Sequence, residues 1–458
     1  MKGLLFKADS DNNKDKKYME RKRIYLCLAH MSDEGLEQKY IKEAFDTNWV
    51  VPLGPNVNGF EKDLEEFVNG TNTNHTDDTN KLSKRVVALS AGTAAVHLSL
   101  IACGVKPGDE VCVQSFTFCA SSHPITYLGA IPVFIDSEKD TWNMDPELLE
   151  EAIKDRIAKT GKKPKAIVPV ALYGMPYKMD RIMEIANKYD IPVIEDAAEG
   201  FGSKFNGQVL GTFGKYGVLS FNGNKMITTS GGGALITPDE EAWREIMMYA
   251  TQYRESYPYY QHEKIGYNYR MSNICAGIGR GQMTVVDQHI QHHKHVQALY
   301  EELLANVPGV HVHSQPDVRW KMADGREVPV YDSNYWLCTI TIDENVKVKG
   351  QENAYKTIVT GAVGGAAGVI HAASSATTDC QPNDNVEALR VFLDQAQIEA
   401  RPVWKPMHKQ PVYKDAPAYV NGVSEAIFKV GMCLPAGPYV SDDDVMYIVD
   451  TIKNAIVS

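Results

Sequence analysis

Short apolar runs alternate with helical stretches over residues 86–237 of the 458-residue chain. The runs are rich in Val and Ile and almost continuously apolar, which is typical of strands covered on both faces. Seven strands are predicted, at 86–90, 110–115, 131–136, 165–172, 191–196, 216–221 and 232–237. Helices are predicted between them at 93–103, 119–128, 146–157 and 178–189. This alternation predicts an α/β fold with a mostly parallel seven-stranded sheet between helices, in which ligands gather at the carboxyl ends of the strands.

The segments outside this alternation follow other patterns. Amphipathic helices are predicted at 36–45 and 60–68, a polar loop at 70–85, and one long helix at 273–306. A second strand–helix–strand unit is predicted at 333–343, 385–396 and 398–404, with a Gly/Ala/Ser-rich insertion around 345–384. We therefore predict a flexible N-terminal tail at 1–22, a large domain at 23–290 and a smaller C-terminal α/β domain at 291–458.

Charge and cysteine content narrow the class of protein. Acidic residues outnumber basic residues, 58 to 47, and the net charge of −11 disfavours nucleic acid or anionic membrane as the main partner. The eight cysteines include no CxxC pair, which argues against a zinc site or a disulfide framework. The sequence indicates neither a signal peptide nor a membrane span. We expect a cytoplasmic protein.

A histidine-rich stretch, QHIQHHKH at 288–295, raises the question of a metal site. His289 and His293 are four residues apart on a predicted helix, which is a possible ligand spacing. The HExxH pattern is not met, because no Glu follows the first histidine. We interpret the stretch as a solvated helix face and expect no metal.

Candidate ligand-binding residues stand at three predicted strand ends. Gly92 and Thr93 open a helix after the first strand, where free N–H groups and the helix dipole can bind an anion, although an ordinary N-cap is the simpler interpretation. Asp196 ends the fifth strand and could partner a protonated ring nitrogen, or could cap a helix. Phe118 follows the second strand and could lie in the core or stack on a planar ligand.

Lys225 stands in the mainly apolar stretch LSFNGNKMITTSGGGAL, at 219–235. A lysine is costly to bury unless it is paired or neutral, so a salt bridge or a snorkelling side chain is the ordinary explanation. The alternative is an amine kept out of water to act as a nucleophile. A phosphate site, a stacking ring, an acidic partner for a ring nitrogen and such a lysine are together what pyridoxal phosphate requires. The four features together therefore favour the interpretation of Lys225 as a nucleophile.

The chain resembles the DegT-type sugar-nucleotide aminotransferases from about Arg23 to the C-terminus. The matching segments are NWVVPLGPNVNGFE (48–61), SAGTAA (90–95), SFTFCAS (115–121), GAIPVFID (129–136), LYGMP (172–176), IEDAAEGFGS (194–203), SFNGNK (220–225), GYNYRMSN (266–273) and RPVWKPMH (401–408). Within the family it is most similar to enzymes of the bacillosamine pathway type, which aminate a UDP-linked 4-keto-6-deoxy-N-acetylhexosamine. The segments TQYRESYPYYQHEKIGYNYR and RPVWKPMHKQPVY carry that closer similarity.

The resemblance implies the pyridoxal-phosphate-dependent transferase fold type I and a homodimer with active sites at the subunit interface. It implies that Lys225 bonds to the cofactor aldehyde, that Asp196 partners the pyridine nitrogen and that Phe118 stacks on the ring. Relatives with histidine in place of the lysine are dehydratases, so Lys225 favours transamination. The remaining residues implied to contact cofactor or substrate are Gly92, Thr93 and Ser220 at the phosphate, Asn268 from the neighbouring subunit, Glu199 near the ring hydroxyl, and Arg401 and His408 at the nucleotide sugar.

The implied reaction moves an amino group from glutamate to the C4 ketone of a nucleotide-linked keto-deoxy sugar, with UDP as the expected nucleotide, for surface polysaccharide or glycan biosynthesis. A GDP-linked 4-keto or a dTDP-linked 3-keto hexose is the alternative substrate. Two other classes of function remain open at this point: a regulator that binds pyridoxal phosphate without turnover, and a structural protein that binds nucleotide sugars without a cofactor.

Overall fold

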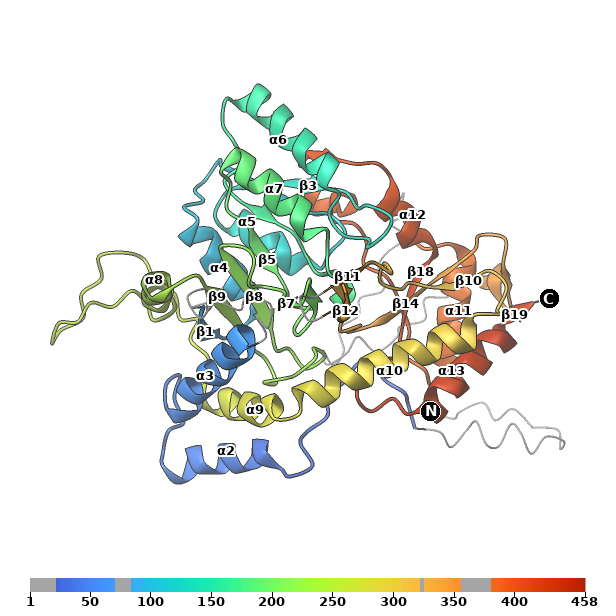
Figure 1. Ribbon diagram of the computed structural model, residues 1–458, viewed down its shortest axis with the longest axis horizontal. Helices are drawn as coiled ribbons and strands as arrows, with labels where there is room; N and C mark the ends of the chain where they lie inside the picture. Colours follow the sequence, from blue (N-terminus) through green and yellow to red (C-terminus); the bar gives the residue numbers. More distant parts are fainter. Residues whose placement is uncertain (1–21, 71–83, 322–324, 356–379, 458) are drawn as a thin grey trace, which may run out of the picture.

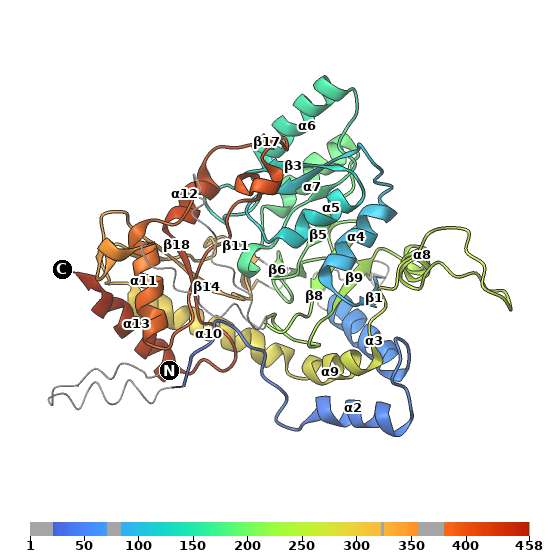
Figure 2. The same cartoon turned by 180° about the vertical axis from the view of Figure 1, so that it is seen from behind.

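The computed structural model describes residues 22–70, 84–321, 325–355 and 380–457. The predicted N-terminal tail, most of the polar loop at 70–85 and the centre of the insertion around 345–384 lie outside these ranges. The larger part of the molecule, blue to green in Figure 1, is built around one long sheet with helices on both faces, and the orange and red C-terminal part lies beside it. Figure 2 shows the same arrangement from behind.

The large sheet contains all seven predicted strands in the order β1-β9-β8-β5-β4-β2-β3. They are β1 (Arg85–Leu89), β2 (Glu110–Gln114), β3 (Ile131–Ile135), β4 (Ile167–Val168), β5 (Ile194–Asp196), β8 (Tyr216–Ser220) and β9 (Gly233–Thr237). The two halves join between β4 and β5 through parallel bridges from Ile167 to Val193 and from Val170 to Asp196. Only β9 runs antiparallel to its neighbours within this described sheet. The predicted mostly parallel sheet is confirmed.

Alternate residues of the strands face opposite helical layers. Val86 and Ala88 pack on one side with α3 (Pro55–Gly70), α6 (Pro146–Thr160) and α7 (Met179–Tyr189). Val87 and Leu89 pack on the other side with α4 (Gly92–Ala102), α5 (His123–Tyr127) and α8 (Glu240–Ala250). Because both faces are covered, the strands need apolar residues at nearly every position, which explains their continuous apolarity.

The predicted long helix is two helices, so this prediction is wrong in detail. They are α9 (Asn273–Met283) and α10 (Val286–Leu304), and the break falls at Thr284, whose hydroxyl donates to the carbonyl of Gly281. Helix α10 runs from the large sheet to the C-terminal part (Figure 1). The predicted domain boundary at residue 290 falls within this helix. The division into two domains stays a prediction.

The solvated-face interpretation of the histidine stretch is wrong for two of its members. His289 and His293 are buried, and their Nδ1 atoms lie 3.1 Å from the carbonyl oxygens of Met226 and Tyr335 respectively. His295 is exposed and pairs with Asp442. The face is buried because α10 is covered along one side by segments that are distant in the sequence.

The C-terminal part contains a second sheet, which is antiparallel, in the order β10-β14-β18-β16. Its strands are β10 (Val310–Val312), β14 (Cys338–Ile342), β16 (Arg401–Pro402) and β18 (Gly431–Leu434), and its helices are α11 (Asp384–Gln395), α12 (Val423–Val430) and α13 (Asp442–Ala455). Strand β17 (Ala418–Tyr419) leaves this part and pairs with β3 at the edge of the large sheet. The C-terminal region is therefore tied to the β3 edge of the large sheet.

The remaining elements are short or peripheral. They are α2 (Leu36–Asp46), β6 (Lys204–Phe205), β7 (Gln208–Val209), β11 (Arg319–Lys321), β12 (Glu327–Pro329), β13 (Tyr331–Asp332), β15 (Lys347–Val348) and β19 (Ile456–Val457). Of the helices in the described ranges, none combines the length and the apolarity needed to cross a lipid bilayer.

Candidate active site

A cavity of about 360 Å³ opens at the carboxyl ends of the large sheet. Residues from five strand ends and from the C-terminal part line it. Seven of the residues predicted from the sequence are among them: Gly92, Thr93, Phe118, Asp196, Glu199, Ser220 and Lys225. These residues span more than a hundred positions of the sequence, and parallel strands bring them together because their carboxyl ends share one edge.

Lys225 lies on the loop after β8, and its amine faces the cavity. The side chain is 13% exposed, and Nζ lies 3.4 Å from Oε1 of Glu199 and 4.0 Å from the ring centroid of Trp336. The backbone N–H of Lys225 donates to the carbonyl of Asn222, which closes a tight turn. The ordinary explanation, a salt bridge, is thus present, and the same amine is also placed where a ligand in the cavity can reach it.

Glu199 is buried beside this amine. Its Oε2 accepts a 2.7 Å hydrogen bond from the backbone N–H of Tyr173, a residue held at a left-handed φ of 53°. Burial raises the pKa of Glu199, and the nearby charge of Lys225 offsets only part of that rise. The carboxyl is therefore a group that can exchange a proton with its neighbours in a buried site.

Asp196 ends β5, is buried, and also lines the cavity. Its Oδ2 accepts a 2.6 Å hydrogen bond from the hydroxyl of Ser121, and its Oδ1 accepts from the N–H of Ala198 at 3.2 Å. Burial raises the pKa of Asp196, against the lowering effects of these two bonds and of Lys225. A cation bound beside Asp196 would offset the cost of burying this carboxylate, which suits a protonated ring nitrogen.

The N-terminus of α4 also lines the cavity. Ala91 stands at the N-cap, and its methyl side chain cannot accept the hydrogen bond that a capping serine would take from the first turn. A Cβ added at Gly92 would lie 3.1 Å from the Cβ of Ser220 and 3.3 Å from the carbonyl oxygen of Leu219. Gly92 therefore keeps open a small cradle between helix amides and a hydroxyl, which fits a phosphate group.

The model of the DegT/DnrJ/EryC1/StrS aminotransferase family matches residues 32–356 and 353–453. The chain belongs to this aminotransferase family. The DegT-type resemblance predicted from the motifs is confirmed at this level.

The chain is similar to two relatives over almost their full lengths. EpsN of Bacillus subtilis strain 168, whose name includes pyridoxal phosphate-dependent aminotransferase, is 40% identical over 94% of this chain and 95% of that relative. GDP-perosamine synthase of Escherichia coli O157:H7 is 31% identical over 94% of this chain and 98% of the relative. A crystal structure of a DegT/DnrJ/EryC1/StrS aminotransferase from Brucella abortus is similar with a TM-score of 0.73, at 26% identity over 92% of this chain and 95% of that chain.

The other three predicted site residues of this aminotransferase lie outside the cavity lining of the described chain. Asn268 is exposed on the segment that bridges back to Thr251. Arg401 forms a 2.6 Å ion pair with Glu399. His408 is half-buried with a 7% exposed side chain, and its Nδ1 lies 2.6 Å from the hydroxyl of Ser115 and its Nε2 3.1 Å from a Glu425 oxygen. Their roles stay predictions.

Sequence reasoning did not single out three residues of the site. Ser121 holds Asp196, and Trp336 and Trp404 line the cavity. The ring centroid of Trp404 lies 5.2 Å from that of Phe118, which is itself 48% exposed. Ser121 and Trp404 stand inside matching motifs, SFTFCAS and RPVWKPMH, so the motif was a usable signal for them. No short-range signal marks Trp336, because it enters the site from a distant segment.

Proposed function

We propose that this aminotransferase moves an amino group from glutamate to the C4 ketone of a nucleotide-linked keto-deoxy sugar, with pyridoxal 5'-phosphate bound in the Lys225 cavity. The observation that carries the proposal is the meeting of a semi-buried amine, a buried carboxylate and an open helix N-terminus in one cavity. The product would enter surface polysaccharide or glycan biosynthesis. The cytoplasmic location rests on the sequence alone.

The residues of the cavity match the groups of this cofactor one by one. The α4 N-terminus with Thr93 and Ser220 would hold the phosphate, and Asp196 would keep the ring nitrogen protonated. Phe118 would cover the ring, and Lys225 would hold the aldehyde end. When bound, the cofactor supplies an electron sink and a carrier for the amino group.

Lys225 has a second task, which is to hold and move a proton. Its Nζ lies within reach of Glu199, and together they form a buried donor–acceptor pair beside the cavity. The amine, once free, would take a proton from the carbon on one side of the transferred nitrogen and deliver it to the carbon on the other side. Glu199 would balance the positive charge of the amine in the interval, because the two groups are already in contact.

A homodimer is part of the proposal. Asn268 lies on an exposed segment rather than in the cavity of its own chain, as expected if it reaches the site of the neighbouring subunit. The exposed apolar residues Trp49, Val50 and Leu53 follow α2 and offer surface for such a contact. Arg401 and His408 are assigned to the nucleotide sugar on the motif alone.

The nucleotide is proposed as UDP, from the similarity of the segments at 251–270 and 401–413 to enzymes that use UDP-linked 4-keto sugars. A GDP-linked 4-keto sugar is the second candidate, because a relative named GDP-perosamine synthase matches 94% of this chain. Both candidates carry a ketone at C4, so they differ in the nucleotide contacts and not in the chemistry.

The test loads the protein with the cofactor, adds glutamate, and then offers a panel of UDP-, GDP- and dTDP-linked keto sugars while the cofactor absorbance is followed. If a UDP-linked 4-keto sugar removes the amino group from the cofactor, the specific proposal is supported. If only a GDP-linked sugar does so, the second candidate replaces it.

Lys225→Ala should lower turnover by at least roughly 1000-fold. Lys215→Ala, at the opposite end of β8, is the matched control. A Lys225→Ala protein with unchanged turnover would contradict the assignment.

A further inference from the structure

Trp336 lies against the amine of Lys225. The Nζ atom is 4.0 Å from the centroid of the indole ring and 3.4 Å from Oε1 of Glu199, so the amine has an aromatic face and a carboxylate as neighbours. Tryptophan gives the strongest cation–π attraction of the aromatic side chains. This attraction can hold an ammonium group against the ring face.

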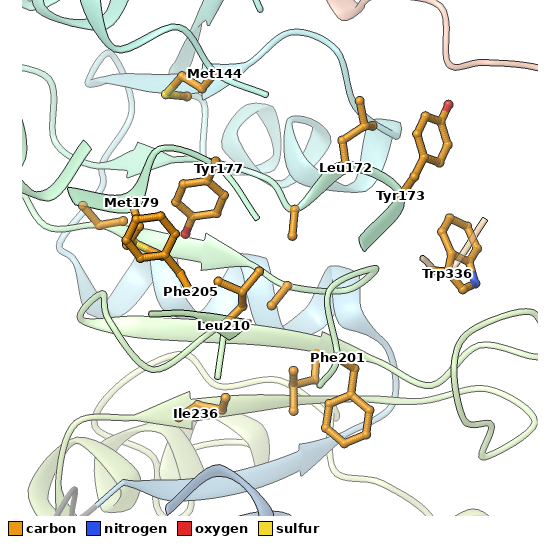
Figure 3. Packing of buried hydrophobic residues seen from close by; sticks show 14 of the residues in the cluster. Met144, Leu172, Tyr173, Tyr177, Met179, Phe201, Phe205, Leu210, Ile236 and Trp336 are labelled. Atoms are coloured by element: carbon orange, nitrogen blue, oxygen red, sulfur yellow. The ribbon is translucent and has the colours of Figure 1, made fainter. Parts of the chain in front are cut away.

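The indole ring is fixed by two further contacts. Its Nε1–H donates a 2.6 Å hydrogen bond to the carbonyl of Asn224, the residue immediately before Lys225. On another side it stacks with Tyr173, with 6.4 Å between ring centroids and 17° between planes, and Figure 3 shows these two rings together. The residue is only 2% exposed. The ring is therefore a rigid surface that is tied to the loop carrying the lysine.

We propose that Trp336 is a positioning residue: its ring face holds the free, charged amine of Lys225 by a cation–π contact and keeps it at the cavity wall. We call this contact the seating of the amine. Its importance for amino transfer rests on the proposed function, because that reaction frees and reuses the amine. The seating itself is a property of the chain without cofactor. It can therefore be tested separately.

Within the described residues, the ionisable groups that interact electrostatically with the amine are Glu199, Asp196 and Cys27. Glu199 and Asp196 both favour the charged amine. Burial raises the pKa of the Cys27 thiol to about 12, so this thiol is neutral near physiological pH. Trp336 variants keep Glu199 and Asp196 in place but lose a hydrogen bond to the Cys27 thiol. Because that thiol is neutral, it brings no charge beside the amine, so a difference in the labelling midpoint reports on the ring.

The experiment labels the cofactor-free full chain competitively with trace acetic anhydride over a pH series, and quantifies the peptide that carries Lys225 by mass spectrometry. Only an uncharged amine reacts, so the midpoint of the pH profile reports the stability of the charged form. The plateau at high pH reports access to the amine. Exposed Lys62 is the internal reference.

Trp336→Leu should lower the midpoint by roughly 0.4 to 1.5 pH units, so that labelling below the midpoint rises roughly 2- to 30-fold. Trp336→Phe keeps a ring face and loses the bond to Asn224, and its midpoint should lie between those of the Leu variant and the unchanged chain. Trp404→Leu removes the other tryptophan of the cavity wall and should leave the midpoint unchanged.

Three results would overturn the proposal: an unchanged midpoint in Trp336→Leu, an equal fall in the Phe and Leu variants, or the same fall in Trp404→Leu. If the Leu variant fails to fold, the Phe variant and the Trp404 control still decide. A chain that transfers no amino group to any sugar, yet shows the predicted order of midpoints, would refute the proposed function and leave the seating intact.

Discussion

Asp196 shows how a single charged residue can be buried at a cost in stability within the proposed cofactor site. Its carboxylate lies out of water and is held by the Ser121 hydroxyl and one backbone N–H. Burial raises its pKa, so the charged form is less stable here than in water until a cation comes beside it. In the proposed holoenzyme that cation is the protonated ring nitrogen of the cofactor.

Asp196→Asn should lower the rate of the glutamate half-reaction on the order of 100- to 1000-fold, because the ring nitrogen loses its charged partner. The same change should leave the melting temperature of the cofactor-free protein unchanged or higher, because a buried carboxyl becomes neutral. Stopped-flow absorbance and thermal unfolding measure the two effects. Ser121→Ala is the milder comparison, and about a 3- to 10-fold loss is expected there, since it removes one hydrogen bond. A full-rate Asp196→Asn enzyme would contradict the assigned role.

Among the elements, α4, β8 and β9 together shape the proposed phosphate site. Strand β9 runs antiparallel between β1 and β8, and a Cβ added at Gly233 would lie 2.3 Å from the backbone nitrogen of Gly92. Glycine at both positions allows the start of α4 to approach the sheet. The cradle is thus a property of three packed elements and not of the SAGTAA motif alone.

Gly92→Ala should weaken binding of pyridoxal phosphate by about 5- to 150-fold, because the new methyl group is crowded against Ser220 and enters the cradle. Titration of the cofactor-free protein, followed by protein fluorescence, measures the affinity. Gly231→Ala is a matched control, since Gly231 also lines the cavity and an added Cβ meets nothing within 4 Å there. Equal affinities for the two variants would show that the phosphate lies elsewhere.

For the molecule as a whole, buried histidines make stability sensitive to acid. Burial lowers the pKa of His293 to about 3 and that of His313 to about 4, whereas an unfolded histidine titrates near 6.5. Because these folded-state pKa values are depressed, the stability contribution is complete above pH 6.5. It is lost as the pH falls from about 6.5 toward about 3, since the unfolded chain binds protons that the native one excludes.

His293→Asn removes one such group and keeps a donor near the position of Nδ1, which faces the carbonyl of Tyr335. Urea unfolding at pH 7.5 and 5.5 should show that the variant loses about 1.4 kcal/mol less stability than the unchanged chain over this interval. If the unchanged chain and His293→Asn lost the same stability between pH 7.5 and pH 5.5, the argument would be refuted.

The features that could be predicted are those that depend on the local pattern of apolar and polar residues along the sequence. The strands were found because burial on both faces demands continuous apolarity, and Lys225 and Asp196 were found because they interrupt or end such runs. His289 and His293 were misjudged, because their burial depends on segments that pack onto α10 from elsewhere in the chain. The break at Thr284 was missed because both helices on either side of it are regular.

By itself, the sequence determined the order of strands and helices, the family, and the residue types that stand at each strand end, since these depend on neighbours along the chain. The tertiary structure decided the reversed direction of β9, the tie of β17 to β3, and the pairing of Lys225 with both Glu199 and Trp336. The physical reason is that a contact between residues that are not neighbours along a helix or strand leaves no periodic trace in either partner. The contact between Lys225 and Glu199 forms only when the loop after β8 packs beside the end of β5, and the contact with Trp336 also needs the C-terminal part.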